Sequence, residues 1–442
     1  MPAPFWRPVL ASAALAFVVR AALFLAASQA HSDSFLSPDA RGYDALARSL
    51  LHDARFAEGP AAPAQSRRTP AFPLLIASVY AVAGEDPRAA VWVGIVLSVL
   101  TAALAAWLAH GLWGVRAAWT AGLLVALDAP SATASRRLLT EAPFTVLLLA
   151  GVAAAIGLLG AGQPRARRGL AVGALFAAAA LTRPIGLLLV IPVSLWLIVC
   201  GRTLGWSRRI TASLLAASLL PWILMVGGWQ VRNRMAVGAF VPSDGPAKFL
   251  YRSRGADIVA QRDGMSYAAA RIQLTRTIEE EAQRTGRPVD RLYAGAALDL
   301  ISRHPILFLN TQVRWLPELL LGTGAAAVDQ ALDLDRTAGR RVMAGLVAVG
   351  AAFQLLLLYA GAARGLWVIR NESPAHRLAA ALLFGLVLYF VVLSTGPQTY
   401  SRFRVPFTPL LALLAARGLD RAGQAAASDP SSSQWARSRR VR

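Results

Sequence analysis

Hydrophobic residues in this chain fall in long stretches separated by short polar segments. These stretches have about 18 to 24 residues with few or no charges, and each is long enough to cross a bilayer as a helix. The pattern predicts an all-α polytopic membrane protein with about ten spanning helices. The expected spans are residues 8–29, 88–110, 117–134, 142–160, 169–182, 185–200, 210–230, 342–362, 378–395 and 405–419.

Two longer regions interrupt these spans. In the first outer loop, residues 70–84 are apolar but short and proline-rich, so a helix lying on the membrane surface is expected there. Residues 231–341 are polar and contain amphipathic stretches, which predicts a mostly helical domain outside the membrane. Within it, residues 305–327 are moderately apolar; a surface helix is expected, and a further membrane span is the alternative.

The expected organisation has four parts. They are a transmembrane module over residues 1–230 with its first outer loop at 30–84, an extracytoplasmic domain at 231–341, C-terminal transmembrane helices at 342–420, and a disordered basic cytoplasmic tail at 421–442.

The composition supports membrane residence. Hydrophobic residues make up 56% of the 442 residues and charged residues only 16%, whereas soluble proteins carry about 25% charged residues. The net charge of +21 would also suit a nucleic-acid-binding protein. That alternative is disfavoured because the arginines lie between hydrophobic spans, where membrane topology accounts for them. The single cysteine, Cys200, excludes an intrachain disulfide and a multi-cysteine metal site.

The distribution of arginine predicts the orientation. Seventeen arginines lie in the N-terminal segment, the C-terminal segment and the short loops on the same side, and five lie in the short loops of the opposite side. Short cytoplasmic loops are enriched in basic residues, so both termini are expected in the cytoplasm. The first outer loop and the 231–341 domain then face outside, in a cell inner (plasma) membrane. The five arginines in the short outer loops are Arg136, Arg137, Arg183, Arg402 and Arg404.

Candidate chemistry gathers on the outer side. The first loop contains SPDARGYDALA (residues 37–47), in which Asp39 and Tyr43 are four residues apart and share one face of a helix beginning near Pro38. Glu141 opens the fourth span. Each carboxylate has a plainer alternative role, Asp39 as a helix cap and Glu141 as a carboxylate at a helix start.

Arginines on this side suit a lipid-linked phosphate, which guanidinium groups can hold through two hydrogen bonds. Arg68, Arg402 and Arg404 are the candidates for that role. Two charged residues, Arg20 and Asp128, fall within expected spans; a functional role and a simple ion pair are equally compatible with the sequence.

Six strings, taken in order, resemble the GT-C superfamily of polyprenyl-phosphate-dependent glycosyltransferases. The similarity is to the branch of protein mannosyltransferases and aminoarabinose transferases (glycosyltransferase family 39-like), and it extends from about residue 30 to residue 420. The strings are PDARGYDALA, RTPAFPLL, LLTEAPF, LTRPIG, WQVRNRMAVGAFVPSDGP and RFRVPFTPLLALLAARGL.

The resemblance implies transfer of a sugar from a polyprenyl (undecaprenyl-type) phosphate on the outer face of the membrane. Asp39 matches the first-loop aspartate, the general base of the family. Glu141 matches the acidic residue of the second outer loop, which in relatives positions the acceptor or a metal ion. Ala40 follows Asp39 where protein mannosyltransferases have a second acidic residue, so a protein acceptor is not specifically implied.

Further expectations concern binding. Tyr43, Arg183 and Tyr400 lie in or beside the matched strings and are candidates for substrate contact. The histidines show no metal-ligand spacing, so no cofactor is assigned, and a divalent metal ion is left open. The expected partners are the lipid-linked sugar, membrane lipids and an acceptor of unknown kind, without nucleic acid. A multi-pass transporter or lipid flippase is the alternative function; such proteins place their binding residues near mid-membrane.

Overall fold

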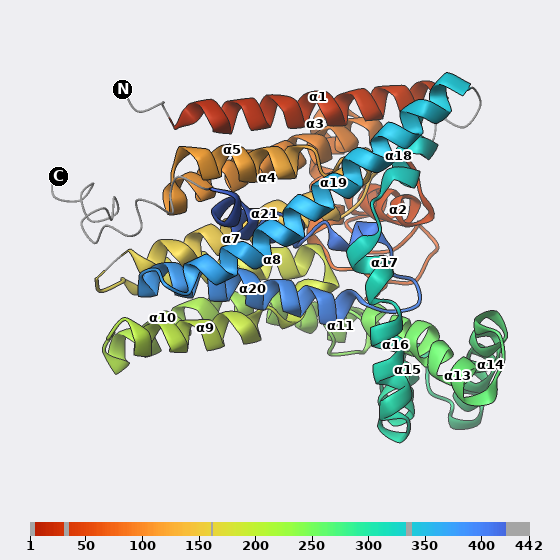
Figure 1. The fold of residues 1–442 in the computed structure, drawn as a ribbon. Helices are drawn as coiled ribbons and strands as arrows, with labels where there is room; N and C mark the ends of the chain where they lie inside the picture. Colours follow the sequence, from red (N-terminus) through yellow and green to blue (C-terminus); the bar gives the residue numbers. More distant parts are fainter. Residues whose placement is uncertain (1–4, 31–34, 161, 333–337, 421–442) are drawn as a thin grey trace.

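The computed structural model describes residues 5–30, 35–160, 162–332 and 338–420, and within these ranges it contains helices and no strands. Long helices lie side by side and run between the two ends of a bundle (Figure 1). The start of α1 (Trp6–Ala30) lies at one end, and α2 (Pro38–Asp53) lies at the opposite end, which we call the outer end. The predicted all-α membrane fold is confirmed, whereas the expected tail at 421–442 lies outside the described ranges.

Within the described ranges, seven helices are long and apolar enough to span a bilayer. Each corresponds to an expected span, and their hydrophobic stretches alone explain why they form. They are α1, α4 (Pro87–Trp113), α7 (Glu141–Leu159), η1 with α9 (Pro184–Thr203), α10 through α11 (Arg208–Val237), α19 (Ala338–Ile369) and α20 (Pro374–Ser394).

The other three expected spans form shorter helices. They are α5 (Val115–Ala126), α8 (Ala166–Thr182) and α21 (Thr408–Leu419), with 12, 17 and 12 residues. A helix of 12 residues is about 18 Å long, well short of a hydrocarbon core of about 30 Å. The number of complete spans is therefore seven by length, and the count of ten is not confirmed.

The expected span at 117–134 is broken because two intramembrane charges stabilise helix ends. The side chain of Asp128 caps α6 (Ala129–Ser135) by accepting from the backbone N–H of Ser131 at 2.9 Å. Arg20 of α1 is fully buried and donates to the carbonyl oxygens of Ala126 at 2.8 Å and Val125 at 3.1 Å, the last residues of α5. Arg20 and Asp128 thus hold the end of one helix and the start of the next, and the backbone groups exposed by the break are satisfied.

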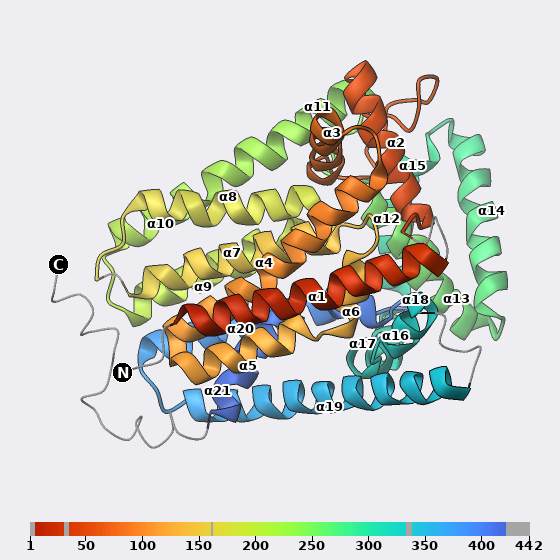
Figure 2. The ribbon, with the colours of Figure 1, turned by 90° about the horizontal axis from the view of Figure 1, so that it is seen from above.

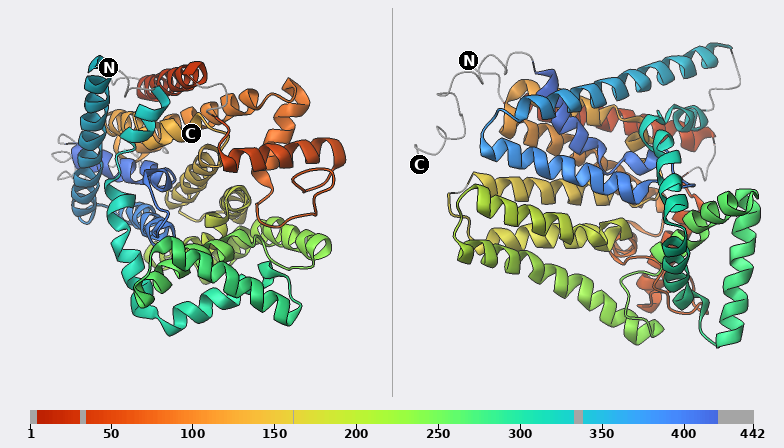
Figure 3. Two further views of the ribbon diagram at one scale, coloured as in Figure 1. Left: turned by 90° about the vertical axis from the view of Figure 1, so that its right-hand side faces the viewer. Right: turned by 60° about the horizontal axis from the view of Figure 1, so that its bottom comes forward.

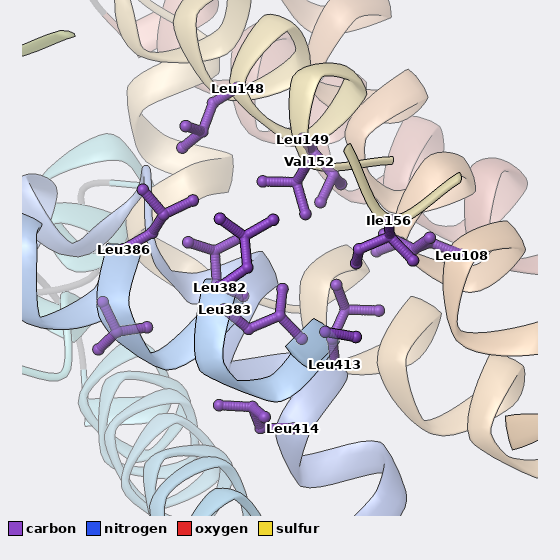
Figure 4. Packing of buried hydrophobic residues seen from close by; sticks show 14 of the residues in the cluster. Leu108, Leu148, Leu149, Val152, Ile156, Leu382, Leu383, Leu386, Leu413 and Leu414 are labelled. Carbon is purple, nitrogen blue, oxygen red and sulfur yellow. The ribbon is translucent and has the colours of Figure 1, made fainter. Parts of the chain in front are cut away.

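The core of the bundle consists of aliphatic side chains from α4, α7, α20 and α21. Figure 4 shows Leu148, Leu383 and Leu413 among leucines that point toward one another from these helices, and all three are fully buried. The helices α19 and α21 approach closely because glycines line their contact. A Cβ atom at Gly365 would lie 2.0 Å from a backbone oxygen of α21, so any larger residue would separate the two helices.

The outer end carries the remaining helices. Viewed from that end, the helices of the first outer loop and those of residues 245–332 surround the ends of the spanning helices (Figure 3, left). The view from above shows both groups gathered at the same end of the bundle (Figure 2). The first outer loop contains α2 and α3 (Ala71–Ala83), which follow the expected helix near Pro38 and the expected short helix at 70–84.

The expected domain at 231–341 begins inside a helix, since α11 continues α10 to Val237. Its segment at 305–327 falls into three short helices, none of which has the length of a membrane span. The helices of this region are α12 (Gly245–Phe249), η3 (Leu250–Gly255), α13 (Ala256–Asp263), α14 (Tyr267–Thr285), α15 (Val289–Arg303), α16 (Pro305–Arg314), α17 (Leu316–Leu321) and α18 (Ala325–Leu332).

Candidate active site

A buried carboxylate lies where three segments of the chain meet at the outer end. Glu141 is the first residue of α7, and its side chain is 1% exposed. Its Oε1 lies 2.7 Å from Nη1 of Arg183 and accepts a hydrogen bond from Nε of Arg402. Arg183 has an extended backbone between α8 and η1, because Pro184 disfavours a helical conformation in the residue before it. Two arginines distant in sequence therefore neutralise Glu141.

A second carboxylate lies on the other side of Arg402. Asp39 is in the first turn of α2, its side chain is 62% exposed, and its Oδ2 lies 3.9 Å from Nη1 of Arg402. The cap of α2 is Ser37, whose side chain accepts from the backbone N–H of Ala40 at 3.3 Å. The alternative role of Asp39 as the helix cap is therefore wrong. Arg402 lies between an exposed carboxylate and a buried one.

The neighbours of Arg402 keep its guanidinium protonated. Burial lowers the pKa of Arg402, but the Glu141 carboxylate and the Tyr400 hydroxyl outweigh that effect and raise the pKa above its ordinary value. The Tyr400 hydroxyl accepts a hydrogen bond from Nη1 of Arg402 at 3.1 Å. Arg402 is therefore a permanent cation near the surface of the outer end, where its side chain is still 18% exposed.

Arg68 lies against the same end of α2. Its Nη1 donates to the backbone oxygen of Asp39 at 3.0 Å, and its guanidinium lies 4.0 Å from the centre of the Tyr43 ring. Gly42 permits this approach, because a Cβ atom there would lie 2.4 Å from Nη2 of Arg68. Burial raises the pKa of the Tyr43 phenol, which Arg68 and Arg183 partly offset, so Tyr43 stays protonated at neutral pH. The structure thus brings together Asp39, Tyr43 and Arg68.

Arg404 does not join this group. Its side chain is fully buried and donates from Nη1 to the carbonyl oxygens of Leu319 at 3.1 Å and Leu320 at 3.2 Å. These carbonyls belong to the last turn of α17, where a cation stabilises the helix end. The structure therefore places Arg404 apart from the other candidate phosphate-binding arginines, where its side chain serves the packing of α17 against the bundle.

Arg136 and Arg137, which were not among the site residues predicted from the sequence, lie beside the site. Burial and the positive charge of Arg402 lower the pKa of Arg137. Arg136 is 2% exposed, burial lowers its pKa to about 10, and its Nε and Nη1 have no hydrogen-bond partner among the described residues. Their position on the outer side, where topology does not favour arginine, is the signal that could have identified them from the sequence.

The described residues do not form a metal site as they stand. None of their histidine, cysteine or carboxylate side chains gather in a group of three or more that could hold an ion. Both candidate carboxylates face Arg402, and His52 is paired with Glu85 at 2.7 Å.

Comparison with known proteins links this geometry to a family. A sequence model of dolichyl-phosphate-mannose-protein mannosyltransferases matches residues 67–229, a segment that includes Arg68, Glu141 and Arg183. No curated protein sequence matches the chain.

Solved structures match nearly the whole chain. AglB, the oligosaccharyltransferase of Archaeoglobus fulgidus in complex with an inhibitory peptide and a dolichol-phosphate, matches with a TM-score of 0.50 at 12% identity, over 91% of this chain and 50% of that one. The apo form of the Archaeoglobus fulgidus enzyme gives a TM-score of 0.51 at 10% identity with the same coverage.

The chain shares the fold of these oligosaccharyltransferase structures. The resemblance seen in the sequence agrees with the family model over residues 67–229, and both that family and the structural neighbours are glycosyltransferases. ArnT from Cupriavidus metallidurans bound to undecaprenyl phosphate also matches, with a TM-score of 0.42 at 16% identity over 93% of this chain and 77% of that one. The chain spans about half the length of the archaeal oligosaccharyltransferase.

Proposed function

We propose that this protein is an inverting glycosyltransferase that uses a polyprenyl-phosphate-linked sugar as donor. The acceptor is a lipid, glycan or protein hydroxyl, and the reaction takes place on the extracytoplasmic face of the inner (plasma) membrane. The observation that carries the proposal is Arg402, a permanent cation between the exposed carboxylate of Asp39 and the buried carboxylate of Glu141. A base and a phosphate-binding cation side by side are what transfer from a phosphate leaving group requires.

Asp39 acts as the general base. Its carboxylate takes the proton from the acceptor hydroxyl while the hydroxyl oxygen forms a bond to the anomeric carbon of the sugar. The bond from that carbon to the phosphate oxygen breaks, and its electron pair stays on the departing polyprenyl phosphate. Because attack comes from the side opposite the phosphate, the anomeric configuration inverts. The 62% exposure of Asp39 leaves its carboxylate accessible to an acceptor.

The arginines stabilise the negative charge that grows on the phosphate. Arg402 and Arg68 lie on either side of Asp39, and Arg137 adds a third positive charge near Arg402. Guanidinium groups bind phosphate through paired, charge-assisted hydrogen bonds. Arg183 forms an ion pair with Glu141, so we assign this pair the role of holding Arg402 in place. Tyr43 and Tyr400 offer hydroxyl and ring contacts to the sugar.

The relatives support the choice of donor. The matching family is described by its dolichyl-phosphate-mannose donor, and the archaeal enzyme of similar fold was solved with a dolichol-phosphate. The excess of arginine in the N-terminal and C-terminal segments and the loops on their side supports an extracytoplasmic site. These comparisons lend no support to the alternative of a transporter or flippase.

The test is sugar transfer by purified protein in lipid nanodiscs, with a panel of polyprenyl-phosphate sugars and membrane extracts as acceptors. Arg402→Ala should lower transfer roughly 10- to 100-fold, because it removes a charge-assisted contact of about 1.5–3 kcal/mol. The control is Arg287→Ala, which removes an exposed arginine far from the site in sequence and should leave transfer unchanged. Movement of the lipid-linked sugar across vesicles without any covalent transfer would contradict the proposal.

A further inference from the structure

Hydrogen bonds hold an irregular stretch of the first outer loop just before Arg68. Nη1 of Arg232, in α11, donates to the backbone oxygen of Gln65 at 3.0 Å. The Ser66 hydroxyl donates to Oδ2 of Asp244 at 2.7 Å, and the backbone N–H of Asp244 donates to the Ser66 oxygen at 3.3 Å. Gln65 is therefore held by α11, and the next residue, Ser66, by the segment that joins α11 to α12.

The next residue is fixed by the same segment. The Ser243 hydroxyl donates to the backbone oxygen of Arg67 at 2.6 Å. A Cβ atom at Gly245 would lie 2.8 Å from that oxygen, so only glycine lets the two backbones approach this closely. The VPSDGP end of the string WQVRNRMAVGAFVPSDGP thus contacts Ser66 and Arg67, the two residues just before the string RTPAFPLL.

The 241–245 segment is itself anchored to α11. The indole Nε1 of Trp229 donates to the Pro242 oxygen at 3.0 Å, and Nδ2 of the buried Asn233 donates to the Val241 oxygen at 2.8 Å. Because α11 continues the spanning helix α10, these contacts tie the loop to a long helix that runs from the far end of the bundle.

We infer that Ser243, Asp244 and Gly245 are positioning residues for Arg68. By fixing the backbone of residues 66 and 67, they hold the Arg68 guanidinium over Gly42 and Tyr43, beside Asp39. Residues 54–69 contain no helix, so the loop offers no other regular structure to set the direction of the Arg68 side chain. The inference rests on the proposed role of Arg68 at the donor phosphate, where small errors of position are costly.

The first experiment measures the loop directly and does not depend on the function. Trypsin cleaves after arginine, and a fixed backbone resists cleavage. Asp244→Ala should speed cleavage after Arg67 and Arg68 in the full-length protein in nanodiscs. The control, Ser266→Ala, removes a helix-capping hydroxyl of α14 in the same domain and should leave this cleavage unchanged. Cleavage at the wild-type rate in Asp244→Ala would overturn the inference.

The second experiment measures binding of undecaprenyl phosphate by native mass spectrometry. Arg68→Ala should weaken binding roughly 10- to 100-fold, and Asp244→Ala should weaken it about 10-fold through misplacement of Arg68. The double variant should bind no more weakly than Arg68→Ala, because the two substitutions act through one contact. Asp244→Asn should restore binding, since its amide oxygen can accept from Ser66.

The outcomes separate the two proposals. Wild-type protein that binds no polyprenyl phosphate would refute the proposed function, while the cleavage experiment still decides the positioning role. Wild-type-like binding by Asp244→Ala, or losses that multiply in the double variant, would refute the positioning role and leave the function standing. If Asp244→Ala does not yield folded protein, Ser66→Ala removes the same hydrogen bond and serves in its place.

Discussion

The sharpest prediction concerns Asp39→Asn, because the structure separates its effect on stability from its effect on catalysis. Ser37, not Asp39, caps α2, and Arg68 contacts the backbone oxygen of Asp39, which the substitution keeps. Among the residues that the structure describes, the Asp39 side chain forms an ion pair with Arg402 alone, at 3.9 Å, and it is 62% exposed.

The magnitude follows from these contacts. An exposed ion pair contributes about 0.2–1 kcal/mol, and the exposure and length of this pair place it at the low end. The loss of stability should therefore be about 0.5 kcal/mol or less. Removal of a general base lowers turnover by about 10²- to 10⁴-fold, which corresponds to roughly 2.7–5.4 kcal/mol in the barrier. The catalytic effect should exceed the effect on stability several times over.

The assay measures transfer per folded molecule in nanodiscs together with thermal unfolding. Asp44→Asn is the matched control on the same helix, because Asp44 accepts hydrogen bonds from Arg48 at 3.0 Å and from the Tyr80 hydroxyl at 2.5 Å. That variant should lose about 1–2 kcal/mol of stability and keep its transfer rate. Transfer by Asp39→Asn within a few-fold of wild type would show that Asp39 is not the base, and Glu141 would be the next candidate.

Three further predictions use other parts of the outer end. Gly42→Ala should leave the stability equal or slightly higher, since alanine favours a helix by about 1 kcal/mol over glycine. It should nevertheless weaken donor binding, because its Cβ would displace Arg68; unchanged donor binding would contradict the role of Arg68 in the proposed site. Cysteines introduced at exposed Ala268 and Asn371 should react differently with an impermeant thiol reagent on intact cells, with Ala268→Cys labelled and Asn371→Cys protected; the reverse pattern would invert the topology. Burial raises the folded-state pKa of Asp244, so ionisation of its carboxyl destabilises the fold as the pH rises through that pKa. Asp244→Asn should therefore be more heat-stable than wild type at pH 7, and the difference in thermal stability between the two proteins should vanish in acid.

Much of the architecture could be predicted from the sequence because the information is local. A stretch of apolar residues must bury its own backbone hydrogen bonds in a bilayer, and a helix does so without any partner. The seven long helices among the described residues follow from this rule. The start of α2 near Pro38 was also predicted, since proline is common at the first helical position, but the cap proved to be Ser37 and not Asp39.

The break in the span at 117–134 was not readable in this way. Hydropathy averages over the window and passes across Asp128, whereas the helix ends there because Arg20, about a hundred residues earlier, binds its last carbonyl oxygens. A charge within an apolar stretch indicates either a helix end or a ligand site. Only the packing of α1 against α5 decides that it is a helix end and not a ligand site.

The candidate site shows the same division between local and distant causes. The sequence by itself determined which residue types lie at the outer end. Arginines there indicated a specific role, because membrane topology does not favour arginine in the loops predicted to be outside. The sequence could not distinguish Arg402 from Arg404, which are two residues apart in the same string. Only the tertiary structure decided, because residues two apart in a 3-10 turn point in different directions. One direction leads to Glu141 and Asp39 and the other to the end of α17, and those partners come together only when the whole bundle folds.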